Sequence, residues 1–360
     1  MNQASAPPAA GALTGAAAPN DADAADGERR RDGARHILAA LDLGTNNCRL
    51  LVARPSSGGF RIVDAFSRIV RLGEGLTASG LLSEAAMDRT IAALRICADK
   101  IRRRGVTHAR SVATEACRRA GNCDQFVARV RRETGIEIEI ISTREEAELA
   151  FNGCAPLLNG HLTRALVFDI GGGSTELGWL TLRPGQMPHL DGWVSVPLGV
   201  VNLTERYGGD SITEAAYEAM VAEVATHLRP FEAAYGIARH VAAGSVQMLG
   251  TSGTVTTLAG VHLGLPRYDR NVVDGSYLEF DAIQAISRGL AAMDCAGRAT
   301  SPCIGPERAD LVVAGCAILE AICTAWPVGR LRVADRGVRE GILFGLLAVT
   351  RRAHADRAQP

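Results

Sequence analysis

The alternation of apolar runs and polar turns predicts an α/β chain from about residue 37 onward. Short apolar runs bounded by glycine, proline or acidic residues are typical of buried strands; they occur at residues 37–43, 48–53, 60–66, 164–168, 177–182 and 193–197. Alternating Ile and Glu at residues 136–141 predicts a strand with one wet face. Apolar residues at helical spacing predict helices beginning at Ser83 and over residues 124–134, 213–235, 307–326 and 337–352.

Two of these strands end in the same way, and the repetition organises the chain. The strand before residue 43 ends at Asp42, and the strand before residue 170 ends at Asp169; each is followed by glycine and a hydroxyl residue. Glycine lets a backbone turn tightly close to a ligand, and the free N–H groups of such a turn form an anion site. Carboxylates such as Asp169 and Glu176 beside the loop are ligands that suit Mg²⁺. Taken alone, the second segment also fits a glycine-rich hairpin that binds nothing.

Two such turns, a domain's length apart, predict two related lobes that face each other across a cleft. This is the phosphate-clamp arrangement of the actin-like ATPase, sugar kinase and Hsp70 superfamily, which the chain resembles. The length of 360 residues also exceeds what one core normally covers. We expect the lobes at residues 36–146 and 147–336, with helix 337–352 packing back on the first.

The ends of the chain have a different composition from the body. Residues 1–35 are rich in Ala, Gly, Pro, Asp and Arg, which predicts a disordered tail, and they lack the apolar region of a signal peptide. A second short tail is expected at residues 353–360. No run reaches the ~18 apolar residues of a membrane span.

Composition excludes several classes of site. The nine cysteines include no CxxC pair, which indicates reduced thiols in a cytoplasmic protein and not a disulfide framework or a zinc site. Lys100 is the only lysine, so a P-loop, which needs Gly-Lys-Ser/Thr, is absent.

Charge is balanced overall but concentrated locally. Net charge is zero, yet residues 89–132 carry twelve Arg or Lys against three acids. A polyphosphate or a nucleotide tail would be attracted to such a segment. The alternative, which we favour for most of these residues, is a set of solvated helix faces.

Two further turns carry candidate chemistry. Ser142 with Glu145, or Thr143 with Glu146, would form a capping box at a helix start; if Ser142 is the cap, Glu146 is free for another role. The turn at residues 250–253 opens a helix and would bind a phosphate or a ribose through its N–H groups and hydroxyls. An ordinary helix N-cap is the alternative reading of that turn.

Seven segments, in the same order, resemble those of the exopolyphosphatase/guanosine pentaphosphate phosphatase (Ppx/GppA) family. They are residues 42–49, 114–118, 141–147, 169–176, 250–254, 307–310 and 334–341. The resemblance spans about residues 37–350 and implies two ribonuclease-H-like lobes. It is a resemblance to the short form of the family, without the additional C-terminal helical domain.

The resemblance also implies residue roles in hydrolysis of a terminal phosphoanhydride. Glu146 would be the general base, Glu176 would help to position the attacking water, and Asp42 and Asp169 would hold Mg²⁺, or Mn²⁺. Phosphate binding is implied for Gly44, Thr45, Asn46, Arg49, Arg118, Gly171, Gly172, Gly173, Ser174, Gly250, Thr251, Ser252 and Gly253.

The substrate and the class of function stay open at this point. Inorganic polyphosphate and guanosine pentaphosphate (pppGpp) present the same terminal group, and a low-turnover alarmone or polyphosphate sensor is an alternative that intact Glu146, Asp169 and Glu176 disfavour. An ATP-using kinase of the same superfamily is disfavoured by residues 142–146. We expect no nucleic-acid or membrane partner, and we leave a homodimer open.

Overall fold

The computed structural model describes residues 36–56, 59–158, 161–184, 186 and 188–357. The tail expected at residues 1–35 lies outside these residues. At the other end the last helix continues to Arg357, past the expected end at residue 352. No helix in the described part of the chain is long and apolar enough to cross a membrane.

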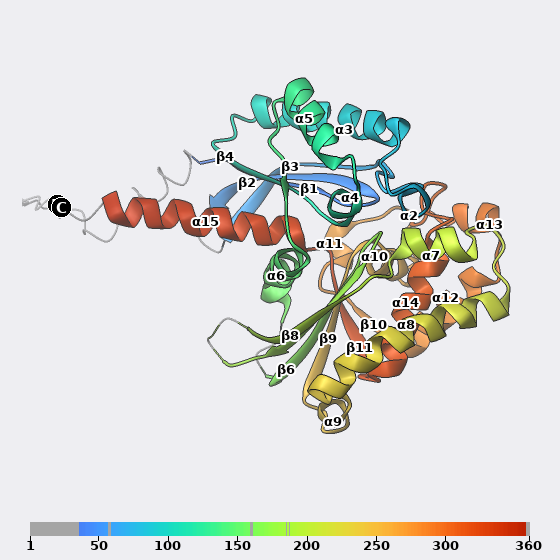
Figure 1. Cartoon of the computed structure of the whole chain (residues 1–360). Helices are drawn as coiled ribbons and strands as arrows, with labels where there is room; N and C mark the ends of the chain where they lie inside the picture. The colour runs from blue at the N-terminus through green and yellow to red at the C-terminus, as the bar shows by residue number, and fades with distance from the viewer. Residues whose placement is uncertain (1–35, 57–58, 159–160, 185, 187, 358–360) are drawn as a thin grey trace, which may run out of the picture.

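Two mixed β-sheets that share a five-strand arrangement form two lobes (Figure 1). The first sheet has the order β3-β2-β1-β4-β5, from β1 Leu38–Leu43, β2 Asn47–Ser56, β3 Gly59–Ile69, β4 His108–Ala113 and β5 Glu139–Ile140. The second has the order β10-β11-β9-β6-β7-β8, from β6 Arg164–Ile170, β7 Thr175–Thr181, β8 His189–Val196, β9 Val246–Thr251, β10 Tyr277–Glu279 and β11 Arg330–Ala334. In each, three antiparallel strands are followed by two strands parallel to the third; in the second sheet β10 then pairs antiparallel with β11 at the edge. The expected α/β fold of two related lobes is confirmed.

Helices cover both sheets. The first lobe has α2 Leu76–Ser79, α3 Glu84–Arg103, α4 Glu115–Arg119 and α5 Cys123–Thr134. The second has α7 Val200–Tyr207, α8 Glu214–Tyr235, α9 Ile237–Ala242, α10 Gly253–His262, α11 Arg270–Val273, α12 Phe280–Ala291, α13 Cys295–Ala299 and α14 Val312–Ala325. Ser83 and Thr213 cap α3 and α8 by accepting the N–H groups of Ala86 and Ala216, as the sequence predicts.

Two predicted elements are shorter than expected. The chain between 136 and 141 pairs with β4 only at Glu139 and Ile140, and Ile136 and Ile141 on either side are buried in different apolar clusters. The helix expected from residue 307 begins at Val312, after a series of turns.

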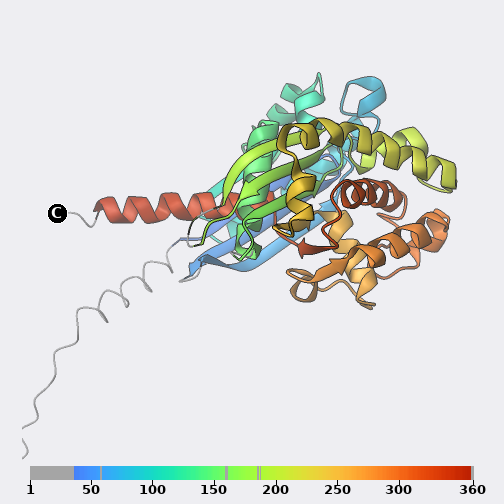
Figure 2. The ribbon, with the colours of Figure 1, turned by 90° about the horizontal axis from the view of Figure 1, so that it is seen from below.

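The two lobes are joined by a pair of exchanged helices. α6 (Thr143–Cys154), followed by the short 3₁₀ helix Ala155–Leu157, comes after the first sheet in sequence but packs on the second. α15 (Val338–Arg357) comes after the second sheet and packs on β1–β4. Its C-terminal half projects from the body of the protein (Figures 1 and 2).

α6 and α15 pack on each other with their backbones in contact. A Cβ on Gly153 would lie 2.0 Å from the Gly337 carbonyl oxygen, and one on Gly341 would lie 2.0 Å from the Leu149 carbonyl oxygen. Only glycine permits this approach. Side chains from both helices and from one face of each sheet form a shared apolar cluster, the interlobe core; it includes Leu38, Ala40, Phe151, Val167, Leu180 and Leu343.

Candidate active site

Strand register brings the four charged residues of the two hairpins to the edge of the interlobe core. Asp42 of β1 lies opposite Arg49 of β2, and Asp169 of β6 lies opposite Glu176 of β7. Because successive side chains alternate between faces, Asp42 and Asp169 share their faces with residues of the interlobe core. The two acids therefore project into the space between the lobes.

The turns that follow the two acids have the same geometry. The N–H of Gly44 donates to the Asn47 carbonyl at 2.9 Å, and the N–H of Gly171 donates to the Ser174 carbonyl at 2.9 Å. Each turn leaves backbone N–H groups at the end of its strand.

The two turns also touch each other. A Cβ on Gly172 would lie 3.0 Å from the Cβ of Thr45, and one on Gly173 would lie 2.8 Å from the Cγ of Glu115. Side chains on the second turn would therefore crowd the first lobe, which explains why glycines stand there.

A cleft of about 130 Å³ lies between the lobes at these turns. Its walls contain most of the residues that the sequence marked: Asp42, Gly44, Thr45, Asn46, Arg49, Glu146, Asp169, Gly171, Gly172, Gly173, Ser174, Glu176, Ser252 and Gly253. The structure thus assembles both turns, all four acids and the start of α10 at one place.

Asp42 and Asp169 form an environment that suits a cation. Burial raises the pKa of Asp42, against the lowering effect of Arg49 and Arg339. Burial also raises the pKa of Asp169 to about 6, with Asp42 adding to the rise. Within the described residues, neither carboxylate has a hydrogen bond or a salt bridge, and no group of three or more His, Cys, Asp or Glu is arranged for a metal. Two carboxylates completed by phosphate oxygens and water are a usual Mg²⁺ environment, so the residues fit this ion.

Glu176 is held by two hydroxyl groups. The Oγ atoms of Ser174 and Ser195 donate to its Oε1 at 2.6 and 2.9 Å. Burial raises the pKa of Glu176 to about 7, although these hydroxyls lower it. Ser195 lies opposite Glu176 on β8, and the sequence alone did not indicate it.

Glu146 is not a helix cap. Ser142 caps α6 by accepting the N–H of Glu145 at 3.2 Å, while the Glu146 carboxylate accepts a hydrogen bond from Arg118 Nη1 at 2.8 Å and lines the cleft. Burial raises the pKa of Glu146 well above its ordinary value; the charge of Glu176 adds to the rise and Arg118 opposes it. Glu145 points elsewhere and pairs with Arg110.

Three residues marked as phosphate-binding do not line the cleft. Arg118 lies behind Glu146, where it also donates to the Ile141 carbonyl and to Glu115, each at 3.0 Å. Gly250 packs on the ring of Phe168, which lies 2.6 Å from an added Cβ. The hydroxyl of Thr251 donates to the Arg336 carbonyl. These three residues therefore lie behind the residues that line the cleft.

The cleft also contains residues that the sequence analysis did not assign. They are Asn47, Thr114, Glu115, Thr254, Thr257 and Arg308, together with apolar residues such as Val200 and Val338. Arg308 donates to the hydroxyl of Thr257 at 3.2 Å and, within the described chain, has no acidic partner. Glu115 and Arg308 lie in segments 114–118 and 307–310, which carried the family resemblance. The sequence analysis recognised these segments but assigned no role to the two residues.

The basic segment at residues 89–132 is neutralised. Eleven of its twelve Arg and Lys side chains lie within 4 Å of a carboxylate, for example Lys100 with Asp64 and Arg95 with Glu133. Most of these cations are therefore paired with acids and do not form a free basic groove; the expectation of solvated helix faces did not include this pairing. At the cleft the unpaired cations are instead Arg49 and Arg308, within the described residues.

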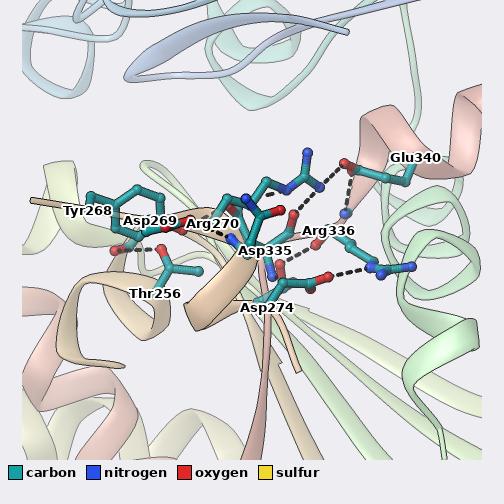
Figure 3. Close-up of polar contacts among 12 residues, drawn as sticks. Thr256, Tyr268, Asp269, Arg270, Asp274, Asp335, Arg336 and Glu340 are labelled. Atoms are coloured by element: carbon teal, nitrogen blue, oxygen red, sulfur yellow. Dashed lines mark hydrogen bonds and ion pairs between the residues drawn. The ribbon is translucent and has the colours of Figure 1, made fainter. Parts of the chain in front are cut away.

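A polar network fixes the turn before α15 (Figure 3). Arg270 donates to Glu340 at 2.6 Å, and Tyr268 donates to Asp335 at 2.7 Å. Asp274 accepts from Arg336 Nε at 2.8 Å and from the Asp335 N–H at 3.0 Å. The network links the chain between the second sheet and α15 to neighbouring elements. This chain passes close to Asp169: an added Cβ on Gly337 would lie 3.9 Å from Asp169 Oδ2.

Comparison with known proteins agrees with this geometry. The model of the Ppx/GppA phosphatase family matches residues 51–349. A solved exopolyphosphatase-like protein is 29% identical, with a TM-score of 0.79 over 86% of this chain and 97% of that one. A Ppx/GppA family member from Aquifex aeolicus is 28% identical, with a TM-score of 0.71 over 88% and 98%. An exopolyphosphatase from Cytophaga hutchinsonii, 24% identical, shares the fold with a TM-score of 0.79 over 87% and 98%.

Proposed function

The chain belongs to the Ppx/GppA phosphatase family, and from this we propose that it is a metal-dependent hydrolase that releases the terminal phosphate of inorganic polyphosphate. Membership makes it a phosphatase of phosphoanhydrides. One observation carries the proposal: Glu146 and Glu176 line the same narrow cleft as the two glycine turns.

The cleft suits the end of a phosphate chain. Its volume of about 130 Å³ is below the ~300–1,000 Å³ of pockets that enclose drug-sized ligands. The two turns would bind the terminal phosphoryl oxygens through backbone N–H groups. Arg49 from the first lobe and Arg308 from the second would neutralise the phosphates on either side, since neither has an acidic salt-bridge partner in the described chain.

Glu146 and Glu176, which come from α6 and from β7 of the second sheet, would activate water. Hydrolysis of a phosphoanhydride needs an oriented water and a group that takes its proton. Glu146, with a raised pKa, would be the base, because a base works best when its pKa is near the working pH. Glu176, fixed by Ser174 and Ser195, would orient the water. Arg118 would hold Glu146 in place.

Asp42 and Asp169 would hold Mg²⁺ or Mn²⁺, which supplies positive charge to the phosphate oxygens when bound. The support is the pair of buried carboxylates without hydrogen-bond partners in the described chain.

The alternative substrate is pppGpp, which ends in the same phosphoanhydride. Polar side chains continue from Ser252 along the start of α10 to Thr254 and Thr257, and these hydroxyls would reach a ribose. The family name joins the two phosphatases, Ppx and GppA, so the choice is left to measurement.

The test is a phosphate-release assay on long-chain polyphosphate and on pppGpp, side by side, with Mg²⁺, with Mn²⁺ and with EDTA. We expect release from polyphosphate, loss in EDTA and recovery with added metal. Full activity in EDTA would contradict the metal role. Preference for pppGpp would favour the alternative, and no release from either would leave a sensor.

A further inference from the structure

A short segment of the first lobe contacts the second lobe beside the cleft. This segment, residues 70–75, connects β3 to α2 and is called the arm. Figure 1 shows α2 beside the junction of the lobes, on the side away from α15. The lobes are thus in contact at two places, through α6 and α15 and through the arm.

The arm is fixed to the first phosphate turn by its backbone. The N–H groups of Val70 and Arg71 donate to the Asn46 carbonyl at 2.9 and 3.0 Å, and that of Gly73 donates to the Thr45 carbonyl at 2.9 Å. An added Cβ on Gly73 would lie 2.3 Å from the Thr45 side chain. The arm and the turn therefore move as one body.

The same arm binds the second lobe through hydrogen bonds to the side chains of Asp310 and Glu205. Arg71 Nη1 and Nη2 donate to the two oxygens of Asp310 at 2.7 and 3.1 Å, and Nη2 also donates to the Glu307 carbonyl at 3.2 Å. The N–H of Gly75 donates to Glu205 of α7 at 3.0 Å. A two-pronged arginine–carboxylate pair fixes direction as well as distance.

The partners of the arm belong to elements that line the cleft. Asp310 lies between Arg308 and Leu311, and Glu205 lies on α7, which begins at the cleft residue Val200. Arg71 has a φ of 49°, a left-handed conformation that a side chain other than glycine adopts at a cost. Such strain is kept where surrounding contacts hold it in place.

We propose that Arg71 and Asp310 are positioning residues, which hold the Asn46 turn and the Arg308 guanidinium at the separation that a phosphate chain requires. Neither touches substrate; they act through the residues on the two walls. The inference rests on the proposed function for its kinetic consequence, but the mechanical link between the lobes does not depend on it.

Hydrogen–deuterium exchange tests the link without substrate. Asp310→Asn weakens the pair and Arg71→Ala removes it, and we expect faster exchange in both the arm and residues 307–311. The control is Arg164→Ala, which breaks the similarly exposed Arg164–Asp191 pair inside the second lobe. Exchange that changes in neither segment, or equally in the control, would overturn the inference.

Kinetics test the consequence. Each single variant should raise KM for polyphosphate by roughly 2–5-fold, the scale of a partly exposed ion pair, with kcat nearly unchanged. The exchanged double variant Arg71→Asp/Asp310→Arg should recover much of the loss. A merely structural pair would lower thermal stability and leave KM alone, which would contradict positioning. If the wild-type protein releases no phosphate while exchange still couples the segments, the proposed function fails and the link stands.

Discussion

The β1–β2 hairpin of the first lobe and the β6–β7 hairpin of the second have the same backbone and different chemistry. Both place aspartate one residue before the strand end, and both turn with the same 2.9 Å glycine hydrogen bond. The position opposite the aspartate differs: it is Arg49 in the first hairpin and Glu176 in the second. One hairpin therefore carries a cation and the other a second acid.

Under the proposed function, this difference would give the two hairpins different parts in the reaction. In the proposed mechanism the two similar turns would offer N–H groups to phosphate from both lobes, while Arg49 would add positive charge and Glu176 would add a carboxylate that orients water. Glu146 joins the acidic side because α6, although it follows the first sheet, packs on the second. The cleft is symmetric in backbone and asymmetric in charge.

The largest effect is expected from replacing Glu146, the proposed general base. Glu146→Gln keeps the size and the hydrogen bond from Arg118 but cannot accept a proton. We expect the rate of phosphate release to fall by roughly 10²–10⁴-fold, the usual contribution of a general base. Glu145→Gln is the matched control, since Glu145 pairs with Arg110. A Glu146→Gln enzyme within a few-fold of wild type would end this mechanism.

The next largest effects distinguish the two hairpins, because we expect substitutions in them to change different kinetic constants. Arg49→Gln should raise KM by about 10–100-fold, because hydrogen bonds to charged groups contribute ~1.5–3 kcal/mol. Glu176→Gln should lower kcat and leave KM nearly unchanged. Arg61→Gln, exposed on β3, is the control for loss of an arginine. If both hairpin variants changed the same kinetic constant, the division between the lobes would be wrong.

The acidic side should also set the pH dependence. The pKa of Glu176 is raised to about 7 and that of Glu146 well above its ordinary value, and the base must be unprotonated to act. We expect kcat/KM to rise with pH through the neutral range and to fall about tenfold per unit on the acid side. A profile measured from pH 5 to 9 that stays flat near neutrality would contradict this assignment.

The smallest effect is on stability. Because the folded pKa of Glu176 is raised above its ordinary value of 4.5, this group favours folding below pH 4.5, and the advantage is lost as the pH rises through about 7. Glu176→Gln should therefore increase the free energy of unfolding at pH 8 in EDTA by on the order of 1–3 kcal/mol, which raises the melting temperature by a few degrees. The increase should be much smaller at pH 5. Arg49→Gln should lower it at pH 8, since Arg49 offsets the charges of Asp42 and Asp169. Calorimetry at both pH values checks the opposite signs.

The sequence by itself determined the local features. Apolar runs ending at Asp42 and Asp169 predicted the strands and turns, because strand alternation and glycine turns are encoded within a few residues. Local sequence also narrowed the cap of α6 to Ser142 or Thr143, and the structure shows that Ser142 is the cap, which leaves Glu146 free. The family resemblance then placed the role of base on Glu146, and the structure puts this carboxylate at the cleft wall.

Only the tertiary structure decided which distant residues meet. Ser195, Glu115 and Arg308 enter the site through strand register and lobe packing, and the same packing withdraws Arg118 behind Glu146. Residues 89–132 looked able to attract a polyphosphate, but most of their cations form ion pairs. Many of the acidic partners, such as Asp64 for Lys100, come from other strands and helices. The physical reason is that a side chain's pattern along the chain fixes its face and spacing, whereas its charge partner depends on the register between elements far apart in the sequence.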